Sequence, residues 1–217
     1  LVENVWAFRF EADESTSWTP GQFIRVELFH ENADGEGTKR WFTISSTPHD
    51  GYIQITTRVT DTTFKQALVA LPVGGTVRLV EQPDGDFVWE DSSRPLVFIA
   101  GGIGITPFYS MLKSRGHGGQ PVNATLVYNG RDNNLPFMEE LEAAANRHTE
   151  FKVIYVIGEQ LSFETLSKQV PDMTHSLIYL SGPEPMVEAL GEDLLKNGLS
   201  RDSIKQDFFP NYTSENY

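Results

Sequence analysis

Signals for a strand, a turn and a helix follow one another in Leu96-Val97-Phe98-Ile99-Ala100-Gly101-Gly102-Ile103-Gly104-Ile105-Thr106-Pro107. The apolar run has strand length, and the proline suits the first turn of a helix. A glycine turn of this kind lets a pyrophosphate lie against bare backbone, where free N–H groups and the helix dipole favour an anion. Any tight strand-to-helix turn also favours glycine, so this GxGxxP string alone is equally consistent with simple packing.

Strand and helix patterns alternate on the C-terminal side of this stretch. Strands are expected at 96–100, 124–128, 151–157, 177–181 and 203–208, and helices at 107–113, 135–146, 163–169 and 185–196. This alternation predicts an α/β domain over residues 93–217, with a parallel sheet covered on both faces. Ligands in such sheets bind at the carboxyl ends of the strands, where the glycine turn lies.

Residues 1–92 have a different pattern, in which short alternating segments are separated by turn residues. The segments are 22–28, 41–45, 52–59 and 76–80, and one helical piece at 62–71 interrupts them. Many short strands with such turns predict a small antiparallel β-barrel. We therefore expect two domains, divided near the polar linker Asp91-Ser92-Ser93-Arg94.

Composition restricts the classes of partner and cofactor. The 217 residues carry a net charge of −13 from 17 basic and 30 acidic side chains, which disfavours nucleic acid and anionic membranes as partners. The absence of cysteine excludes disulfides, cysteine zinc sites and iron–sulfur clusters within the chain. The five histidines have no partner at metal-ligand spacing, so no metal site is expected.

Hydropathy predicts no transmembrane segment, because no apolar run approaches the ~20 residues that span a bilayer. We expect a cytoplasmic protein or the cytoplasmic module of a membrane protein. The first residue is Leu1, which leaves open that the chain is an excised module of a longer polypeptide.

Three further segments agree with the glycine turn. They are Arg40-Trp41-Phe42-Thr43-Ile44-Ser45-Ser46, Ser181-Gly182-Pro183-Glu184-Pro185-Met186 and Asp207-Phe208-Phe209-Pro210-Asn211-Tyr212. In this order the four segments resemble the ferredoxin–NADP reductase superfamily, whose marks are R-x-Y-[ST], G-x-G-x-x-P, C-G-P-x-x-M and a C-terminal aromatic. The resemblance covers nearly the whole chain and implies an FAD-binding barrel followed by an NAD(P)-binding domain.

The resemblance assigns a flavin site to the barrel. Arg40 would bind the flavin pyrophosphate, because a guanidinium matches phosphate oxygens and keeps its charge. Phe42 stands at the family's tyrosine and would stack on the isoalloxazine, while the Thr43 hydroxyl would hydrogen-bond flavin N5. The flavin-binding residues so implied are Arg40, Trp41, Phe42, Thr43, Thr57, Arg58, Thr62, Thr63, Phe64 and Phe209.

The second domain would bind the nicotinamide nucleotide. Ser181 stands where the family has cysteine, close to the position of hydride transfer, and Arg131 is either a ribose or phosphate contact or a surface arginine. Glu159 would repel a 2′-phosphate, which favours NADH over NADPH. The residues so implied are Gly102, Ile103, Gly104, Thr106, Pro107, Arg131, Ser181, Gly182 and Pro183.

The C-terminal aromatic of the family covers the flavin until nicotinamide displaces it. Phe209 stands at its position, but eight residues follow, which leaves open whether Phe208, Phe209 or Tyr212 has this role. Asp207 falls near an acidic residue of some relatives. The residues expected at the reacting atoms are Thr43, Ser181 and Phe209.

These features together indicate an FAD-dependent NAD(P)H oxidoreductase. A hydride would pass from NAD(P)H to FAD N5, and electrons would then pass to a haem, an iron–sulfur protein, a membrane domain or a small molecule. The main alternative is the electron-transfer module of a larger membrane oxidoreductase. A non-catalytic flavin or nucleotide sensor and a nicotinamide-only dehydrogenase are more distant alternatives.

Overall fold

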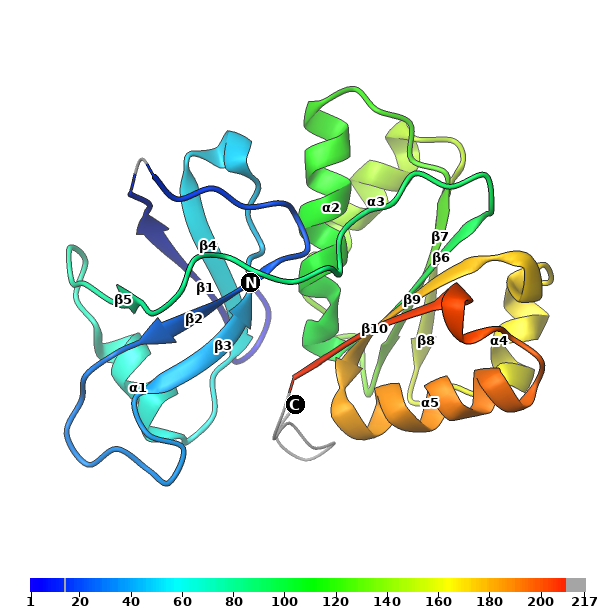
Figure 1. Cartoon of the computed structure of the whole chain (residues 1–217). Coiled ribbons are helices and arrows are strands. Elements are labelled where there is room, and N and C mark those ends of the chain that lie inside the picture. Colours follow the sequence, from blue (N-terminus) through cyan, green and yellow to red (C-terminus); the bar gives the residue numbers. More distant parts are fainter. Residues whose placement is uncertain (14, 210–217) are drawn as a thin grey trace.

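The structure, a computed structural model, describes residues 1–13 and 15–209 and consists of two halves (Figure 1). The barrel half contains the antiparallel strands and one helix. Its strands are β1 (Val5–Glu11), β2 (Phe23–Glu27), β3 (Lys39–Thr43), β4 (Tyr52–Arg58) and β5 (Arg78–Leu79). They form a two-stranded sheet β1-β4 and a three-stranded sheet β3-β2-β5, and a bridge between Ile44 and Ile55 connects the two.

Alternation along the strands builds the core of the barrel half. Ile24 of β2 pairs with Phe42 of β3, and both side chains lie in the core with 2% and 4% exposure. Helix α1 (Thr63–Ala70) closes this core with Phe64 and Leu68, which are both buried. The hydrophobic faces of the strands therefore meet α1 inside the barrel.

The sheet half contains five parallel strands in the order β10-β9-β6-β7-β8. The strands are β6 (Leu96–Gly101), β7 (Ala124–Gly130), β8 (Phe151–Ile157), β9 (Leu177–Pro183) and β10 (Ile204–Phe209). The helices are α2 (Thr106–His117), α3 (Met138–Arg147), α4 (Phe163–Gln169) and α5 (Glu184–Lys196). Short 3-10 helices η1 (Pro48–Asp50), η2 (Gly102–Ile105), η3 (Met173–His175) and η4 (Arg201–Ser203) occur in the connections.

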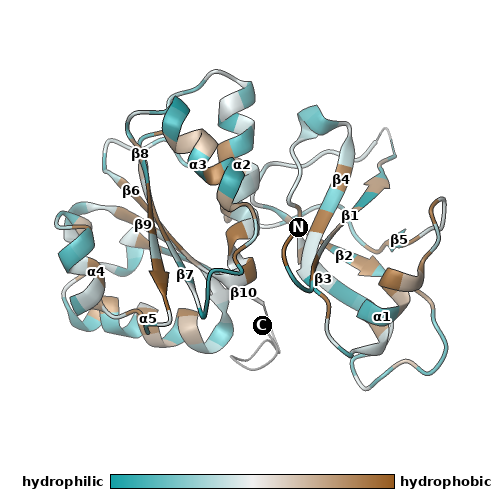
Figure 2. Ribbon diagram, turned by 180° about the vertical axis from the view of Figure 1, so that it is seen from behind, coloured by the Kyte–Doolittle hydropathy of each residue, from teal (hydrophilic) through white to brown (hydrophobic). Residues whose placement is uncertain are grey.

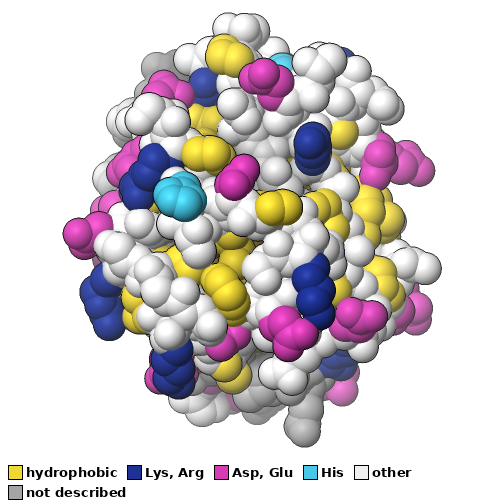
Figure 3. All heavy atoms as spheres, turned by 90° about the vertical axis from the view of Figure 1, so that its right-hand side faces the viewer, with side chains coloured by type: hydrophobic (Ala, Val, Ile, Leu, Met, Phe, Trp, Pro, Cys, Tyr) yellow, Lys and Arg dark blue, Asp and Glu magenta, His cyan; other side chains and the backbone are white. Residues whose placement is uncertain are grey.

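Both faces of this sheet are covered. Phe98 of β6 lies in one buried cluster with residues of α2 and α3, while Val97 and Ile99 lie in another with residues of α4 and α5. Figure 2 shows hydrophobic colour concentrated on the central strands and mixed colour on the helices. On the outer face in Figure 3, basic and acidic side chains are interspersed. The expected fold class, an antiparallel barrel followed by an α/β domain, is confirmed.

Several element boundaries differ from the sequence expectation. Strand β1 was not predicted, and β5 is only two residues long. Helix α3 begins at Met138 rather than near residue 135, because Phe137 has a left-handed backbone with φ 66° and interrupts the helix there. The division at residue 92 stays a prediction.

Helix α2 connects the two halves. The Gly21 N–H donates to Ser110 Oγ at 3.1 Å, and Lys113 Nζ lies 2.7 Å from Asp50 Oδ1. Gly21 has φ 105°, and a Cβ there would lie 2.1 Å from the Phe87 carbonyl oxygen, so this close approach requires glycine. The contacts orient α2, and with it the glycine turn, against the barrel half.

Candidate functional site

The glycine turn lies between β6 and α2 and packs against the end of β9. A Cβ at Gly104 would lie 2.4 Å from the Ser181 carbonyl oxygen and 2.7 Å from Gly182 Cα. A Cβ at Gly101 would lie 2.5 Å from Met186 Sδ. Gly104 is therefore required by packing against backbone, whereas the neighbour of Gly101 is a flexible methionine side chain, and the turn brings the predicted Gly104, Ser181 and Gly182 together.

Helix η2, which contains the glycines of the turn, runs directly into the start of α2. No side chain caps its N-terminus, and its first turn contains no acidic residue. The Thr106 hydroxyl donates to the Ile103 carbonyl at 3.1 Å, and Pro107 stands in the first turn, where the missing N–H is not needed by the helix. The Thr106 N–H already donates to the Ile103 carbonyl of η2, so the candidate backbone donors to an anion are the N–H groups of the glycine turn that leads into α2.

Ser181 and Asp207 are paired residues of β9 and β10. Ser181 is fully buried, and its Oγ lies 3.5 Å from Asp207 Oδ2. Burial raises the pKa of Asp207 to about 7; the hydrogen bond from Ser181 lowers this pKa and the charge of Asp86 raises it. Asp86 belongs to the barrel half, so a carboxyl group that titrates near neutral pH lies where the two halves meet.

Sequence reasoning gave Asp207 no role, although the expected parallel pairing of the last two strands places it opposite Ser181. Phe209 pairs with Pro183 at the end of β10. The side chain of Phe209, and Tyr212 as a whole, lie outside the described residues. Phe208 is 41% exposed.

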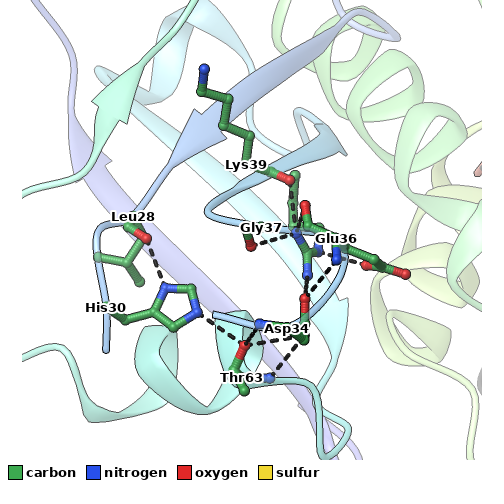
Figure 4. A network of polar contacts seen from close by, with 8 residues as sticks. Leu28, His30, Asp34, Glu36, Gly37, Lys39 and Thr63 are labelled. Carbon is green, nitrogen blue, oxygen red and sulfur yellow. Dashed lines mark hydrogen bonds and ion pairs between the residues drawn. The ribbon is translucent and has the colours of Figure 1, made fainter. Parts of the chain in front are cut away.

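Arg40 is held by the loop that precedes β3 (Figure 4). Its Nη1 donates to the carbonyls of Glu36, Gly37 and Lys39, each at 2.9 Å. Its Nη2 donates to Asp34 Oδ1 and its Nε lies against Glu36 Oε2, both at 2.9 Å. The guanidinium is 11% exposed and lies 5.2 Å above the ring of Phe64.

The start of α1 lies beside Arg40. The Thr63 N–H donates to Asp34 Oδ2 at 3.3 Å, and the Thr63 hydroxyl donates to the same oxygen at 3.1 Å. Arg40 and the N-terminus of α1 therefore bind one carboxylate between them. This arrangement is a candidate anion site, in which the Asp34 carboxylate takes the place of the anion.

Two buried polar atoms near this site have no hydrogen-bond partner. They are Thr62 Oγ1, at the N-cap of α1, and Arg58 Nε, at the end of β4. Burial lowers the pKa of Lys65 to about 8; the charge of Glu36 raises this pKa, and those of Arg40 and Arg58 lower it. Three cations thus gather around the first turn of α1, and the sequence analysis had named only two of them.

Arg58 also lies close to the sheet half. Its charge acts on the hydroxyl of Tyr128, which donates to the Gly102 carbonyl at 3.1 Å. β4 contacts η2 directly. Arg58 therefore stands between the anion site at α1 and the glycine turn at α2.

The aromatic residues of β3 differ from the expectation. Phe42 faces the barrel core, where its ring lies 5.9 Å from that of Phe64, so it offers no exposed face for a flavin. Trp41 faces the opposite side, is 40% exposed and packs edge-on against Phe23. The reason is the register with β2, which places Phe42 opposite the core residue Ile24. The stacking role given to Phe42 stays a prediction that requires this ring to move.

The remaining predicted residues occupy two places. Thr43 and Thr57 are buried in the barrel half, and the Thr57 hydroxyl donates to the Arg58 carbonyl at 3.4 Å. Arg131 and Glu159 are exposed at the carboxyl ends of β7 and β8. Asn129 fixes this edge by donating to the carbonyls of Val156 and Glu159, each at 2.9 Å.

The residues present fit a dinucleotide. A diphosphate suits the site at α1, which has two polar atoms without a hydrogen-bond partner, three cations and the carboxylate of Asp34 held by Thr63. A diphosphate also suits the glycine turn before α2, where the glycines carry no side chains. Across the described residues, no group of three metal-ligating side chains is found. Within the same residues, no helix is long and apolar enough to cross a membrane.

Comparison with known proteins agrees with this geometry. Residues 98–192 match the oxidoreductase NAD-binding domain family. Flavohemoprotein A of Dictyostelium discoideum is 26% identical over 95% of this chain and 57% of its own length. The glycine betaine monooxygenase reductase subunit of Chromohalobacter salexigens is 28% identical over 96% of this chain and 62% of its own length. The chain therefore spans about three fifths of these two relatives.

Solved structures share the fold along nearly the whole chain. The FAD/NAD-binding domain of nitric oxide dioxygenase from Vibrio cholerae has a TM-score of 0.81 at 20% identity, with 96% of this chain and 93% of that one covered. A ferredoxin NADP+ reductase from Neisseria gonorrhoeae with bound FAD and NADP has a TM-score of 0.77 at 18% identity, with 94% and 92% covered. The domain match over residues 98–192, the relatives and the shared two-part fold support the resemblance to the ferredoxin–NADP reductase superfamily.

Proposed function

We propose that the chain is an FAD-dependent NAD(P)H oxidoreductase module. The observation that carries this proposal is that β4, which ends at Arg58, contacts η2, while the Arg58 charge acts both on Lys65 of α1 and on Tyr128 beside the glycine turn. FAD, when bound, supplies the redox chemistry, because it accepts a hydride at N5 from a nicotinamide and releases electrons to a separate acceptor.

The protein's own residues would bind and orient the two nucleotides. Arg40, Arg58, Lys65 and the start of α1 would hold the flavin diphosphate, while the N–H groups of the glycine turn before α2 would hold the nicotinamide diphosphate. Ser181 is fully buried beside Asp207, so its hydroxyl would hydrogen-bond the reacting rings only after the surrounding residues move. Asp207 would hold a proton on its carboxyl oxygen at neutral pH and lower.

The nucleotide preference is inferred from Glu159, and the class of electron acceptor from the relatives. Glu159 is exposed at the end of β8, where its charge would disfavour a 2′-phosphate, so we infer a preference for NADH. The relatives are a flavohemoprotein and a monooxygenase reductase subunit, which supports a haem or an oxygenase component as the acceptor. We place the module in the cytoplasm, alone or as part of a larger oxidoreductase.

A second candidate is a flavin sensor without turnover. The buried ring of Phe42 and the carboxylate at Arg40 favour it, because both would have to move for a flavin to bind as in a reductase. Serine in place of the family's cysteine also favours slow hydride transfer.

The visible spectrum of the purified protein tests both candidates, followed by anaerobic titration with NADH and separately with NADPH. A flavin spectrum that either nucleotide bleaches supports the reductase. Bound flavin that neither nucleotide bleaches supports the sensor. A colourless protein that added FAD cannot restore contradicts the flavin assignment.

A further inference from the structure

We propose that Asp34 is an internal latch on the flavin site: its carboxylate occupies the diphosphate position in the flavin-free protein and leaves it when FAD binds. The latch loop is residues 31–38, between β2 and β3. This inference rests on the proposed function, since it concerns how the same site is opened.

The contacts of Asp34 are those expected of a bound phosphate. Oδ1 accepts from Arg40 Nη2 at 2.9 Å, and Oδ2 accepts from the Thr63 N–H at 3.3 Å and the Thr63 hydroxyl at 3.1 Å. A guanidinium, a helix-terminal N–H and a hydroxyl are the donors that proteins use for phosphates. A diphosphate held by these donors and the Asp34 carboxylate exclude each other.

Charge balance favours the exchange. Asp34 and Glu36 both pair with Arg40, and the charge of Glu36 also acts on Lys65, so two carboxylates lie among the cations Arg40, Arg58 and Lys65. A diphosphate carries two negative charges on one group, and it would be repelled by both carboxylates if they stayed. Release of the loop would transfer Arg40 from the two carboxylates to the diphosphate.

The latch loop can move without disturbing the core. Residues 31–33, 35 and 36 are exposed, whereas Leu28 before the loop and Phe42 after it are buried. Besides its contacts with Arg40, the loop is held to α1 by Asp34 Oδ2 and by the Asp34 N–H, which donates to Thr63 Oγ1 at 3.1 Å. His30 steadies the same hydroxyl, because its Nε2 lies 3.0 Å from Thr63 Oγ1 (Figure 4). A segment with few apolar contacts opens at low free-energy cost.

FAD affinity of flavin-stripped protein is the first test. Asp34→Asn keeps the shape but removes the charge that competes with the diphosphate. We expect its Kd for FAD, measured by quenching of flavin fluorescence, to fall on the order of tenfold, since the open fraction of the protein rises. Asp13→Asn is the matched control, because Asp13 also closes a turn in an exposed loop but pairs with Ser15 instead of a cation. Its Kd should equal that of the wild type.

Hydrogen exchange of the wild-type protein gives a second readout without any substitution. On addition of FAD, the N–H groups of Asp34, Glu36 and Gly37 should exchange several-fold faster, because their partners lie within the latch or on Thr63. Ligand binding normally slows exchange, so faster exchange confined to this loop is specific to the latch.

The outcomes separate the latch from the proposed function. Equal or weaker FAD binding by Asp34→Asn, or slower exchange of the three N–H groups with FAD, overturns the latch while the flavin assignment stands. Failure of the wild type and both variants to bind FAD overturns the proposed function and the latch with it.

Discussion

The two helix N-termini that we propose to face nucleotides differ in the means by which they would recognise an anion. At α1, three cations and two carboxylates surround the first turn, and a carboxylate of the protein itself occupies the site. At α2, the first turn has no acidic residue, and glycine Cα atoms lie against the backbone of β9. Charge dominates the first site, and space around the backbone dominates the second.

The difference predicts how each site responds to change. A site built from side-chain charges depends on salt and tolerates small changes of volume. A site built from close-packed backbone has no side-chain charge to lose, but one extra methyl group disrupts it. The following substitutions test whether the site at α1 depends on charge and the site at α2 on packing.

Gly104→Ala should have the largest effect. The new Cβ would lie 2.4 Å from the Ser181 carbonyl oxygen, so β9 and the turn must separate. We expect the free energy of unfolding to fall by about 3 kcal/mol, at the upper end of overpacking penalties, and reduction by NADH to be lost. Thermal or urea unfolding and stopped-flow reduction measure the two effects.

Gly116→Ala is the matched control in the same helix. Nothing lies within 4 Å of a Cβ at Gly116, and alanine favours the helix, so this variant should be stabilised by about 0.5–1 kcal/mol. Equal behaviour of the two variants would contradict the packing account of the turn.

Arg40→Ala should weaken FAD binding on the order of 100-fold while leaving the affinity for NADH within about twofold. Two charge-assisted hydrogen bonds lost at about 1.5 kcal/mol each account for this size. Arg9→Ala removes a barrel arginine that binds Gln54 instead, and it should retain wild-type affinity for FAD. Fluorescence titration with each nucleotide measures the effects, and a parallel loss of NADH affinity would show that the two sites are not independent.

The sequence predicted the sheet half better than the barrel half. Most of its strands are largely apolar runs that alternate with helices, and the signal of the glycine turn is local, so the order of elements followed directly. Strand β1 mixes exposed Trp6 with polar residues and is defined by its pairing with β4, which no local pattern reveals. The burial of Phe42 likewise depends on register with β2.

The charged site was predicted only in part for the same reason. Arg40 and Thr63 were found through the family motifs. Asp34 stands in an Asn-Ala-Asp-Gly sequence that is typical of a surface turn, and its contact with Thr63 spans 29 residues. Lys65 is buried by its position on α1, which composition does not indicate.

Asp207→Asn tests the carboxyl group that lies between the two sites. Burial raises the pKa of Asp207 to about 7, so the folded protein holds this proton more tightly than the unfolded chain, whose carboxyl has a pKa of 3.8. The resulting stabilisation is complete below about pH 4 and is lost as the pH rises through 7. The stability of Asp207→Asn relative to the wild type should therefore rise by roughly 2 kcal/mol between pH 4 and 8, after allowance for partial solvent access.

Urea unfolding across this pH range measures the effect. Asp13→Asn again serves as control with the opposite sign, because hydrogen bonds from Ser15 lower the pKa of Asp13 and its contribution is lost on acidification. A constant difference between Asp207→Asn and the wild type would contradict the raised pKa.

Glu159→Arg should have the smallest effect. It tests the difference between the two sites directly, because it adds a basic side chain to the nicotinamide nucleotide site, which has little side-chain charge. The backbone at Glu159 is fixed by Asn129 while the side chain is exposed, so the substitution changes charge without changing the fold. The ratio of kcat/KM for NADPH to that for NADH should rise about three- to fivefold at low salt, the scale of an exposed charge pair. The gain should shrink in high salt as the charge is screened. Glu150→Arg makes the same change of charge at the other end of β8, just before its first residue, and it should leave the ratio unchanged. If both variants shift the ratio alike, the preference between NADPH and NADH depends on the net charge of the protein and not on the residue at the end of β8.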